Sequence, residues 1–273
     1  MEGIFFMERY SVICEKNKRE IVLLRGSGCR WRRCRFCDYH LDSSTCEEEN
    51  ARINSDALAQ VTGCFRRLEV INSGSFPELP VQTVEEIERV CAEKGIYDLH
   101  TEFHYLWREE IAPLKERMGK RGIRVTVKTG IETFDYLFRE SYLDKGIPNV
   151  PPEELARDFD EVCLLFGLPG QTAESMRRDV ETGLRYFQRV CVNIMQRNSA
   201  KIYPDASVIE TFMKELYPVW REDGRVDILL ENTDNTFTTP VYNGSTALRD
   251  AAGQMIESVT KSVRRNETVD DAY

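Results

Sequence analysis

Short apolar runs alternate with helical patterns along most of this chain, and this alternation is the feature that most constrains its fold. Helical patterns cover 108–120 and 173–188, and Thr83 and Glu86 form a capping box that predicts a helix reaching about Gly95. Strands that alternate with helices form a parallel sheet, which either closes into a barrel or stays open with helices on both faces. The pattern alone leaves both architectures open. Strands are predicted at 21–24, 68–71, 97–101, 123–129, 162–166 and 190–195.

Polar segments follow the predicted strands at their carboxyl ends. The first strand runs into a cysteine-rich loop, the second into 72–75, and later strands end near Glu102, Glu132 and Gly167. In both barrels and open parallel sheets, ligands bind beyond the carboxyl ends of the strands. We therefore expect one end of the sheet to carry the chemistry.

Three of the nine cysteines, Cys29, Cys34 and Cys37, lie within nine residues on the first loop. The spacing is compatible with two metal sites. A closed zinc site would take His40 as its fourth ligand, whereas a 4Fe-4S cluster held by three thiolates keeps one iron open for an outside ligand. The position on a loop that leaves a strand favours the cluster. Among the scattered cysteines, we expect three to pack in the core as small apolar side chains: Cys91, Cys163 and Cys191.

This loop and four later segments resemble the radical S-adenosylmethionine (SAM) enzymes, particularly the branch of the elongator catalytic subunit and the oxygen-independent coproporphyrinogen oxidases. The later segments are 71–76, 97–102, 129–133 with 144–146, and 166–172. The cysteines are separated by four and then two residues, whereas this family usually has three and two. The resemblance implies an α/β fold, a partial (β/α)6 TIM-like barrel. It also implies a single domain over 1–273, with a core at about 20–200 and a segment 201–273 that completes the substrate pocket.

The resemblance further implies a cofactor set and the residues that hold it. Cys29, Cys34 and Cys37 would bind a 4Fe-4S cluster, and SAM would bind to its open iron. One electron, from reduced flavodoxin or ferredoxin, would then cleave SAM into methionine and a 5'-deoxyadenosyl radical that takes a hydrogen atom from the substrate. The residues implied for SAM binding are Phe36, Asn72, Ser73, Gly74, Glu102, Glu132, Lys145 and Gly167.

A small buried substrate fits the sequence better than a nucleic acid. The formal net charge of −9 gives no global basic field, and the local arginines at 30, 32, 33 and 35 flank the cluster loop, where they would balance its charge or dock an acidic donor. A carboxylate near the barrel mouth would accept both the N–H and the amino group of a guanine-like edge, although 232–235 also fits a plain turn. The expected substrate residues are Asn193, Tyr203, Glu231, Asn232 and Asp234.

The short single-domain chain is similar to the branch of this family that acts on queuine. This similarity implies cleavage of a carbon–nitrogen bond in a queuine-like 7-deazapurine, which releases 7-aminomethyl-7-deazaguanine in queuosine salvage. Two alternatives stay open: a radical SAM reaction on another small molecule or a tRNA base, such as methylthiolation, and a zinc-stabilised binding module. With no apolar run long enough for a membrane span, no signal-peptide pattern and an odd number of cysteines, we expect a cytoplasmic protein.

Overall fold

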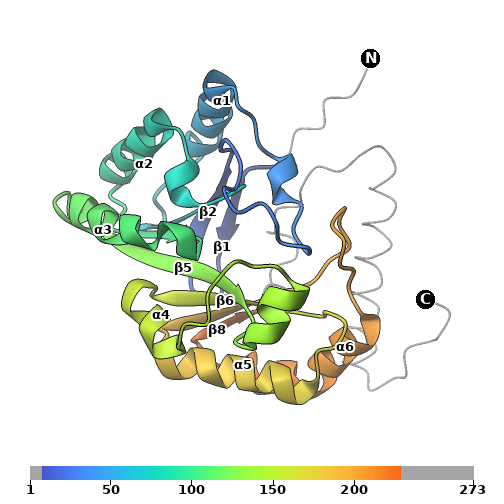
Figure 1. The fold of residues 1–273 in the computed structure, drawn as a ribbon. Coiled ribbons are helices and arrows are strands. Elements are labelled where there is room, and N and C mark those ends of the chain that lie inside the picture. The colour runs from blue at the N-terminus through green and yellow to red at the C-terminus, as the bar shows by residue number, and fades with distance from the viewer. Residues whose placement is uncertain (1–7, 229–273) are drawn as a thin grey trace.

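In the computed structural model, which describes residues 8–228, eight strands form one sheet in chain order from β1 to β8 (Figure 1). The first pair is antiparallel, and every later pair is parallel. The strands are β1 (Tyr10–Ile13), β2 (Arg19–Leu24), β3 (Arg67–Asn72), β4 (Asp98–Glu102), β5 (Arg124–Glu132), β6 (Glu161–Phe166), β7 (Arg189–Ile194) and β8 (Val226–Ile228). The six predicted strands are confirmed as β2 to β7.

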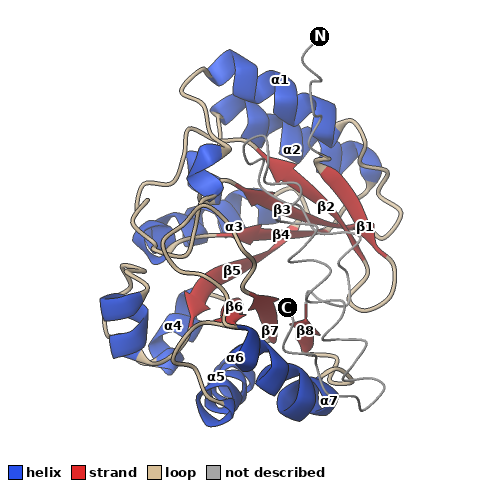
Figure 2. Cartoon of the chain, turned by 90° about the vertical axis from the view of Figure 1, so that its right-hand side faces the viewer, coloured by secondary structure: helices blue, strands red, loops and turns tan. Residues whose placement is uncertain are grey.

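The strand order decides between the two architectures that the sequence left open. A doubly wound sheet reverses its strand order at a switch point, but here each strand from β2 to β8 lies beside its successor. The sheet curls as in a barrel, and within residues 8–228 β1 and β8 do not pair, so the barrel stays open (Figure 2). The predicted partial TIM-like barrel is confirmed. The predicted single domain extends to residue 273, outside the described residues, and stays a prediction.

The helices cover the convex side of the curled sheet (Figure 2). They are α1 (Glu47–Leu58), α2 (Val81–Lys94), α3 (Ile111–Gly119), α4 (Pro152–Asp158), α5 (Ala173–Tyr186), α6 (Ala206–Thr211) and α7 (Tyr217–Trp220). None of the helices within the described part of the chain has both the length and the apolar character needed to cross a membrane.

The predicted capping box at Thr83 and Glu86 is wrong. α2 already begins at Val81, and Thr83 lies inside it, where its Oγ1 accepts a hydrogen bond from Asn54 Nδ2 of α1 at 3.1 Å. A capping box forms instead eight residues earlier, before α2, where Ser75 caps the 3-10 turn Phe76–Glu78 together with Glu78. The Thr83 hydroxyl therefore joins α1 to α2, whereas the local pattern assigns it to the start of the helix.

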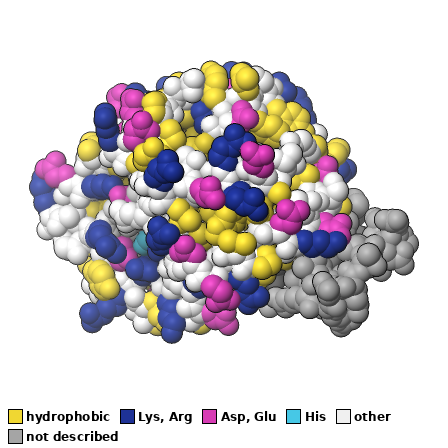
Figure 3. Space-filling view, turned by 90° about the horizontal axis from the view of Figure 1, so that it is seen from below, with side chains coloured by type: hydrophobic (Ala, Val, Ile, Leu, Met, Phe, Trp, Pro, Cys, Tyr) yellow, Lys and Arg dark blue, Asp and Glu magenta, His cyan; other side chains and the backbone are white. Residues whose placement is uncertain are grey.

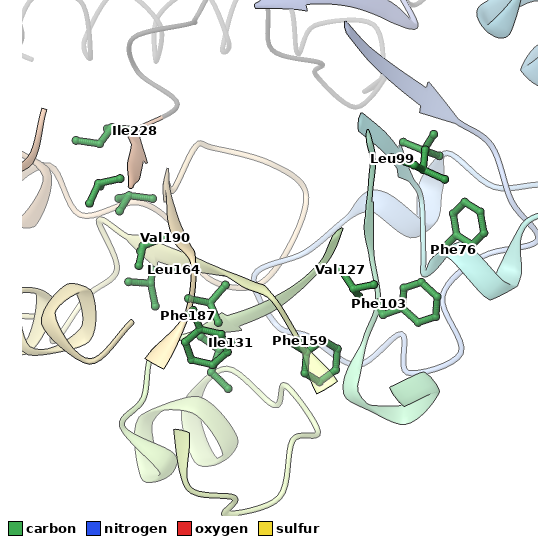
Figure 4. Packing of buried hydrophobic residues seen from close by; sticks show 14 of the residues in the cluster. Phe76, Leu99, Phe103, Val127, Ile131, Phe159, Leu164, Phe187, Val190 and Ile228 are labelled. Carbon is green, nitrogen blue, oxygen red and sulfur yellow. The ribbon is translucent and has the colours of Figure 1, made fainter. Parts of the chain in front are cut away.

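The main hydrophobic core lies between the convex face of the sheet and these helices. Every second residue of β6, Val162, Leu164 and Phe166, belongs to this core, and residues of the neighbouring strands extend it (Figure 4). The residues between them face the concave side, where charged and polar groups gather. This alternation places the apolar surface outside the half-barrel and leaves its interior for chemistry.

The lower face of the molecule is mixed in charge (Figure 3). Figure 3, a view from below, shows acidic and basic side chains interspersed with apolar ones over the described part of this face. This face therefore presents no continuous basic surface to a polyanion.

Candidate active site

The loop after β2 carries the three clustered cysteines and is held by the loops that follow β3 and β5 at the same edge of the sheet. Near its start, the Gly26 N–H donates to Ser73 Oγ at 3.3 Å. Further along, the Arg30 N–H donates to Glu78 Oε1 at 2.6 Å, and Trp31 Nε1 donates to the Asp144 carbonyl at 2.6 Å. These bonds fix the loop between the segments that follow β3 and β5.

The three thiols of this loop form no disulfide and are partly buried. Burial raises the pKa of Cys34 to about 11 and that of Cys37 to about 12, while the nearby Lys145 ammonium opposes both shifts. The Cys37 N–H donates to the Cys34 carbonyl at 3.4 Å, and the neighbouring Cys29 adds to the raised pKa of both thiols. Ligation to a metal would supply the positive charge that deprotonation of such thiols requires.

This arrangement fits a cluster better than a single metal ion. Within the described residues, no three His, Cys, Asp or Glu side chains converge as ligands of one ion, so His40 does not complete a zinc site with the cysteines. A 4Fe-4S cluster binds its three thiolates at three separate irons, and its ligands need no common centre. Three unpaired thiols on one short loop, beside a buried lysine, match that donor set.

Glu132 and Lys145 form a buried ion pair beside the cysteine loop. Lys145 Nζ lies 2.7 Å from Glu132 Oε1, and the ammonium also sits 5.6 Å from the centre of the Phe36 ring. The pairing of β5 with β6 shifts between Gly130 and Glu132, and Glu132 has a φ of 65°. This bulge turns the glutamate out of the strand towards Lys145. Three residues implied for SAM binding are thus brought together.

The segment after β3 lies directly against the cysteine loop. A Cβ on Gly74 would overlap the Glu78 carboxylate and would come within 3.3 Å of Cys29 Cα, so the absence of a side chain at position 74 favours this close approach. Asn72 donates from Nδ2 to the Ser75 carbonyl at 3.1 Å, and its buried Oδ1 has no partner within residues 8–228. Ser73 is buried beside it. A buried acceptor without a partner is what a ligand with an N–H or O–H group would satisfy.

Glu102 ends β4 on the concave face. Its Oε1 lies 3.3 Å from Lys128 Nζ and 3.9 Å from Cys163 Sγ. Cys163 pairs in register with Cys191 of the next strand, and both side chains are buried. Both are buried as predicted, but neither belongs to the main hydrophobic cluster, because strand alternation points them to the concave side, near Lys128. Cys91, in contrast, lies in the main core as predicted.

The remaining predicted residues occupy different parts of the site edge. Gly167 follows β6 with a φ of 88°, and its carbonyl accepts the Asp205 N–H at 2.8 Å. Asn193 of β7 is half-buried and lies opposite Leu165 on the concave face. Tyr203 is 46% exposed, with the Arg197 guanidinium 3.3 Å from its ring centre. Glu231, Asn232 and Asp234 lie outside the described residues.

Sequence reasoning missed two residues that organise this site. Glu78 accepts from the Ser75 and Arg30 N–H groups and from Trp107 Nε1, and the Ser-x-x-Glu spacing from Ser75 was a signal for it. His104 bonds through Nε2 to the Lys145 carbonyl at 2.8 Å, while its Nδ1 accepts the Leu106 N–H. The carbonyl can only accept, so the proton is on Nε2. Burial and the Lys145 charge lower the pKa of His104 to about 4, which keeps it neutral; no local pattern announces it.

Comparison with solved structures places this fold among known enzymes. The chain is 42% identical to a queuine lyase from Clostridium spiroforme bound to SAM and queuine, over 86% of this chain and 100% of that chain, with a TM-score of 0.81. A methylornithine synthase is 16% identical over 92% of this chain and 83% of that one, with a TM-score of 0.50, a likeness in fold alone. No family model and no curated protein matches.

The half-barrel, the three-cysteine loop and these likenesses define the chain as a radical SAM enzyme. Within that class it belongs to the family of the queuine lyases. Its cofactors are SAM and a 4Fe-4S cluster.

Proposed function

We propose that this protein cleaves the carbon–nitrogen bond of queuine and releases 7-aminomethyl-7-deazaguanine in queuosine salvage. The single observation that carries the proposal is the 42% identity, over the full length of that chain, to the queuine lyase bound to SAM and queuine. When bound, the cluster and SAM supply a carbon radical that takes a hydrogen atom from the substrate. The protein's residues hold these groups and exclude competing reactions.

Cys29, Cys34 and Cys37 are the proposed ligands of the cluster. Their loop is held in place by the bonds from Gly26 and Arg30 to the segment after β3. The Lys145 ammonium offsets part of the negative charge that three thiolates bring into a partly buried site.

The proposed SAM site is formed by the groups around this loop. The Phe36 ring would stack on the adenine, and the unpartnered Asn72 Oδ1, with Ser73 and Gly74, would receive the amino acid end. Glu102 supplies a carboxylate oxygen from β4, while Glu132 and Lys145 support the site as a pair. Gly167 completes the edge, and the lack of a side chain there lets Ile209 of α6 pack against it: a Cβ at position 167 would lie 2.7 Å from Ile209.

Asn193 and Tyr203 are proposed to contact queuine from β7 and the following segment. Glu231, Asn232 and Asp234, which lie outside the described residues, are proposed to complete the substrate site. A carboxylate from this set would accept the paired N–H and amino group of the deazaguanine edge.

We further propose that the enzyme works in the cytoplasm and receives its electron from reduced flavodoxin or ferredoxin. All nine cysteines are free thiols, as in proteins of a reducing compartment. The arginines of the cluster loop give an acidic donor a local basic surface. Arg33 is 63% exposed there and lies over the Trp31 ring, with its Cζ 4.7 Å from the ring centre.

Electron paramagnetic resonance tests the class of reaction first. Anaerobically reconstituted protein is reduced with dithionite, and spectra are recorded with and without SAM. A reduced-cluster signal that changes shape on SAM addition is expected. A silent protein that contains zinc would contradict the proposal.

The same samples then test the substrate. Queuine is added, and 5'-deoxyadenosine and 7-aminomethyl-7-deazaguanine are measured by mass spectrometry. We expect both products with the wild type and neither with Cys34→Ala. Formation of 5'-deoxyadenosine while queuine stays intact would keep the radical SAM reaction and reject queuine as the substrate.

A further inference from the structure

A series of linked ion pairs crosses the concave face of the sheet and ends at Glu102. Arg19 of β2 contacts Glu69 of β3, and Glu69 contacts Lys128 of β5. Lys128 Nζ also lies 3.3 Å from Glu102 Oε1 on β4. The side chains of the first three residues are 5 to 7% exposed, whereas that of Glu102 is 35% exposed. This series of ion pairs therefore runs from the buried interior to the more exposed edge of the site.

Lys128 and Glu69, the two central members of this series, are both ionised at neutral pH. Burial opposes the charged form of Lys128, but the Glu69 carboxylate outweighs it and raises the pKa of the lysine well above its usual value. In the same way, Lys128 and Arg19 lower the pKa of Glu69 well below its usual value against the effect of burial. Lys128 is thus a permanent ammonium, and Glu69 already supplies it with one carboxylate.

The contacts of Glu102 with the interior are made through Oε1. This oxygen lies 3.3 Å from the Lys128 ammonium and 3.9 Å from the Cys163 thiol. Oε2 forms no hydrogen bond with any group in residues 8–228. When interior groups hold one oxygen of a carboxylate, its second oxygen points in a fixed direction towards a ligand at the edge of the site.

We propose that Lys128 is a positioning residue for SAM binding: it fixes Glu102 through Oε1 so that Oε2 accepts a hydrogen bond from SAM. This inference rests on the proposed function, in which Glu102 binds SAM. A purely structural role for Lys128, the neutralisation of Glu69, makes a different prediction once Glu69 no longer carries a charge.

The test therefore first removes the buried charge of Glu69, which Lys128 would otherwise be needed to neutralise. Glu69→Gln abolishes the charge of Glu69 and leaves Lys128 beside Glu102, while Arg19 keeps Asp227, whose Oδ2 lies 3.7 Å from its Nη1. The double variant Glu69→Gln/Lys128→Met then removes the ammonium without leaving a buried unpaired carboxylate at position 69. Full-length, cluster-loaded proteins are compared by iron content, melting temperature and the SAM dissociation constant from anaerobic calorimetry.

We expect Glu69→Gln to keep the SAM dissociation constant within about threefold of the wild type. The double variant should raise it at least tenfold at an iron content and melting temperature equal to those of Glu69→Gln. Glu69→Gln/Lys128→Arg should restore affinity, because a guanidinium can also hold Oε1. Equal SAM affinity in Glu69→Gln and the double variant would overturn the positioning role.

Glu102→Gln separates this inference from the proposed function. If Glu102→Gln weakens SAM binding and the double variant does not, the positioning role fails and the SAM site stands. If Glu102→Gln leaves SAM binding unchanged while queuine is cleaved, the lyase activity stands, but Glu102 is no SAM residue and the inference falls. If both weaken binding, adding Glu102→Gln to the double variant should give little further loss, because both changes remove one interaction.

Discussion

Trp31 packs its indole ring flat against the backbone of Gly146, so closely that a Cβ at position 146 would overlap the ring. The same ring donates from Nε1 to the Asp144 carbonyl and stacks with His104 at a centroid distance of 6.0 Å. Trp31 lies in the four-residue spacer between the first two cysteines, one residue longer than the usual spacing of the wider class. This spacer therefore ties the cluster loop to the segment that carries Lys145.

Gly146→Ala tests this contact. The substitution puts a side chain at a φ of 76° and against the indole ring, so we expect a loss of about 2 to 4 kcal/mol in unfolding free energy, measured in urea, and a lower iron content. Gly122→Ala is the matched control, because its φ is 75° and nothing lies within 4 Å of its Cβ. Equal losses in the two variants would mean that the Trp31 contact contributes nothing.

The ligand assignment predicts that Cys34→Ala and Cys91→Ala differ sharply. Cys34 lies on the cluster loop, whereas Cys91 is fully buried in the main core. We expect reconstituted Cys34→Ala to lose its iron and its SAM cleavage and Cys91→Ala to keep both, as determined by iron and sulfide analysis. The same iron content in both variants would contradict the assignment of Cys34 as a cluster ligand.

Lys145→Gln should make the cluster harder to reduce. The ammonium lies near Cys34 and Cys37, so its loss removes a positive charge that stabilises the reduced, more negative cluster. We expect a more negative midpoint potential in an anaerobic redox titration. Adding Glu132→Gln removes the partner charge as well and should bring the potential back towards the wild type.

Lys120→Gln is the surface control for this experiment. Its ion pair with Glu116 on α3 is 73% and 69% exposed, and no shift in potential is expected there. A shift of similar size in the control would show that the effect of Lys145 is not local.

Asp179 of α5 predicts a pH-dependent stability. Its Oδ1 accepts the Phe134 N–H at 2.8 Å, yet burial raises the pKa of Asp179 to about 6 from 3.8. The folded state then favours the protonated carboxyl. The contribution of Asp179 to the unfolding free energy should fall by about 2 to 3 kcal/mol as pH rises from about 4 through 6 and stay level above that.

Asp179→Asn should remove this fall, because the amide oxygen still accepts the Phe134 N–H but does not ionise. In urea titrations, the variant should be more stable than the wild type at pH 8 and similar to it at pH 4. Asp179→Ala, which lacks the acceptor, should be less stable than Asp179→Asn at both values. A parallel pH dependence in the wild type and Asp179→Asn would exclude this carboxyl as the cause.

Local sequence patterns found the six parallel strands because apolar runs of strand length, separated by helical periods, have few other solutions. They missed β1, which is only four residues long, and misplaced the capping box, since Asn54 of a distant helix engages Thr83. They identified Cys163 and Cys191 as buried but did not show on which face of the sheet these two thiols lie. Apolar flanks identify a buried strand, but the curl of the sheet decides which of its two faces meets helices and which meets charges.

The sequence by itself determined the cysteine loop, the order of the motifs and the edge of the sheet at which they meet, because the carboxyl ends of successive parallel strands must lie together. Only the tertiary structure decided the partners: Trp31 with Gly146, Glu132 with Lys145, and Lys128 between Glu69 and Glu102. Lys128 and Glu69 are 59 residues apart in the chain. Ion pairs over such separations depend on strand register and sheet curvature, which arise from packing throughout the domain and leave no mark on the residues beside them.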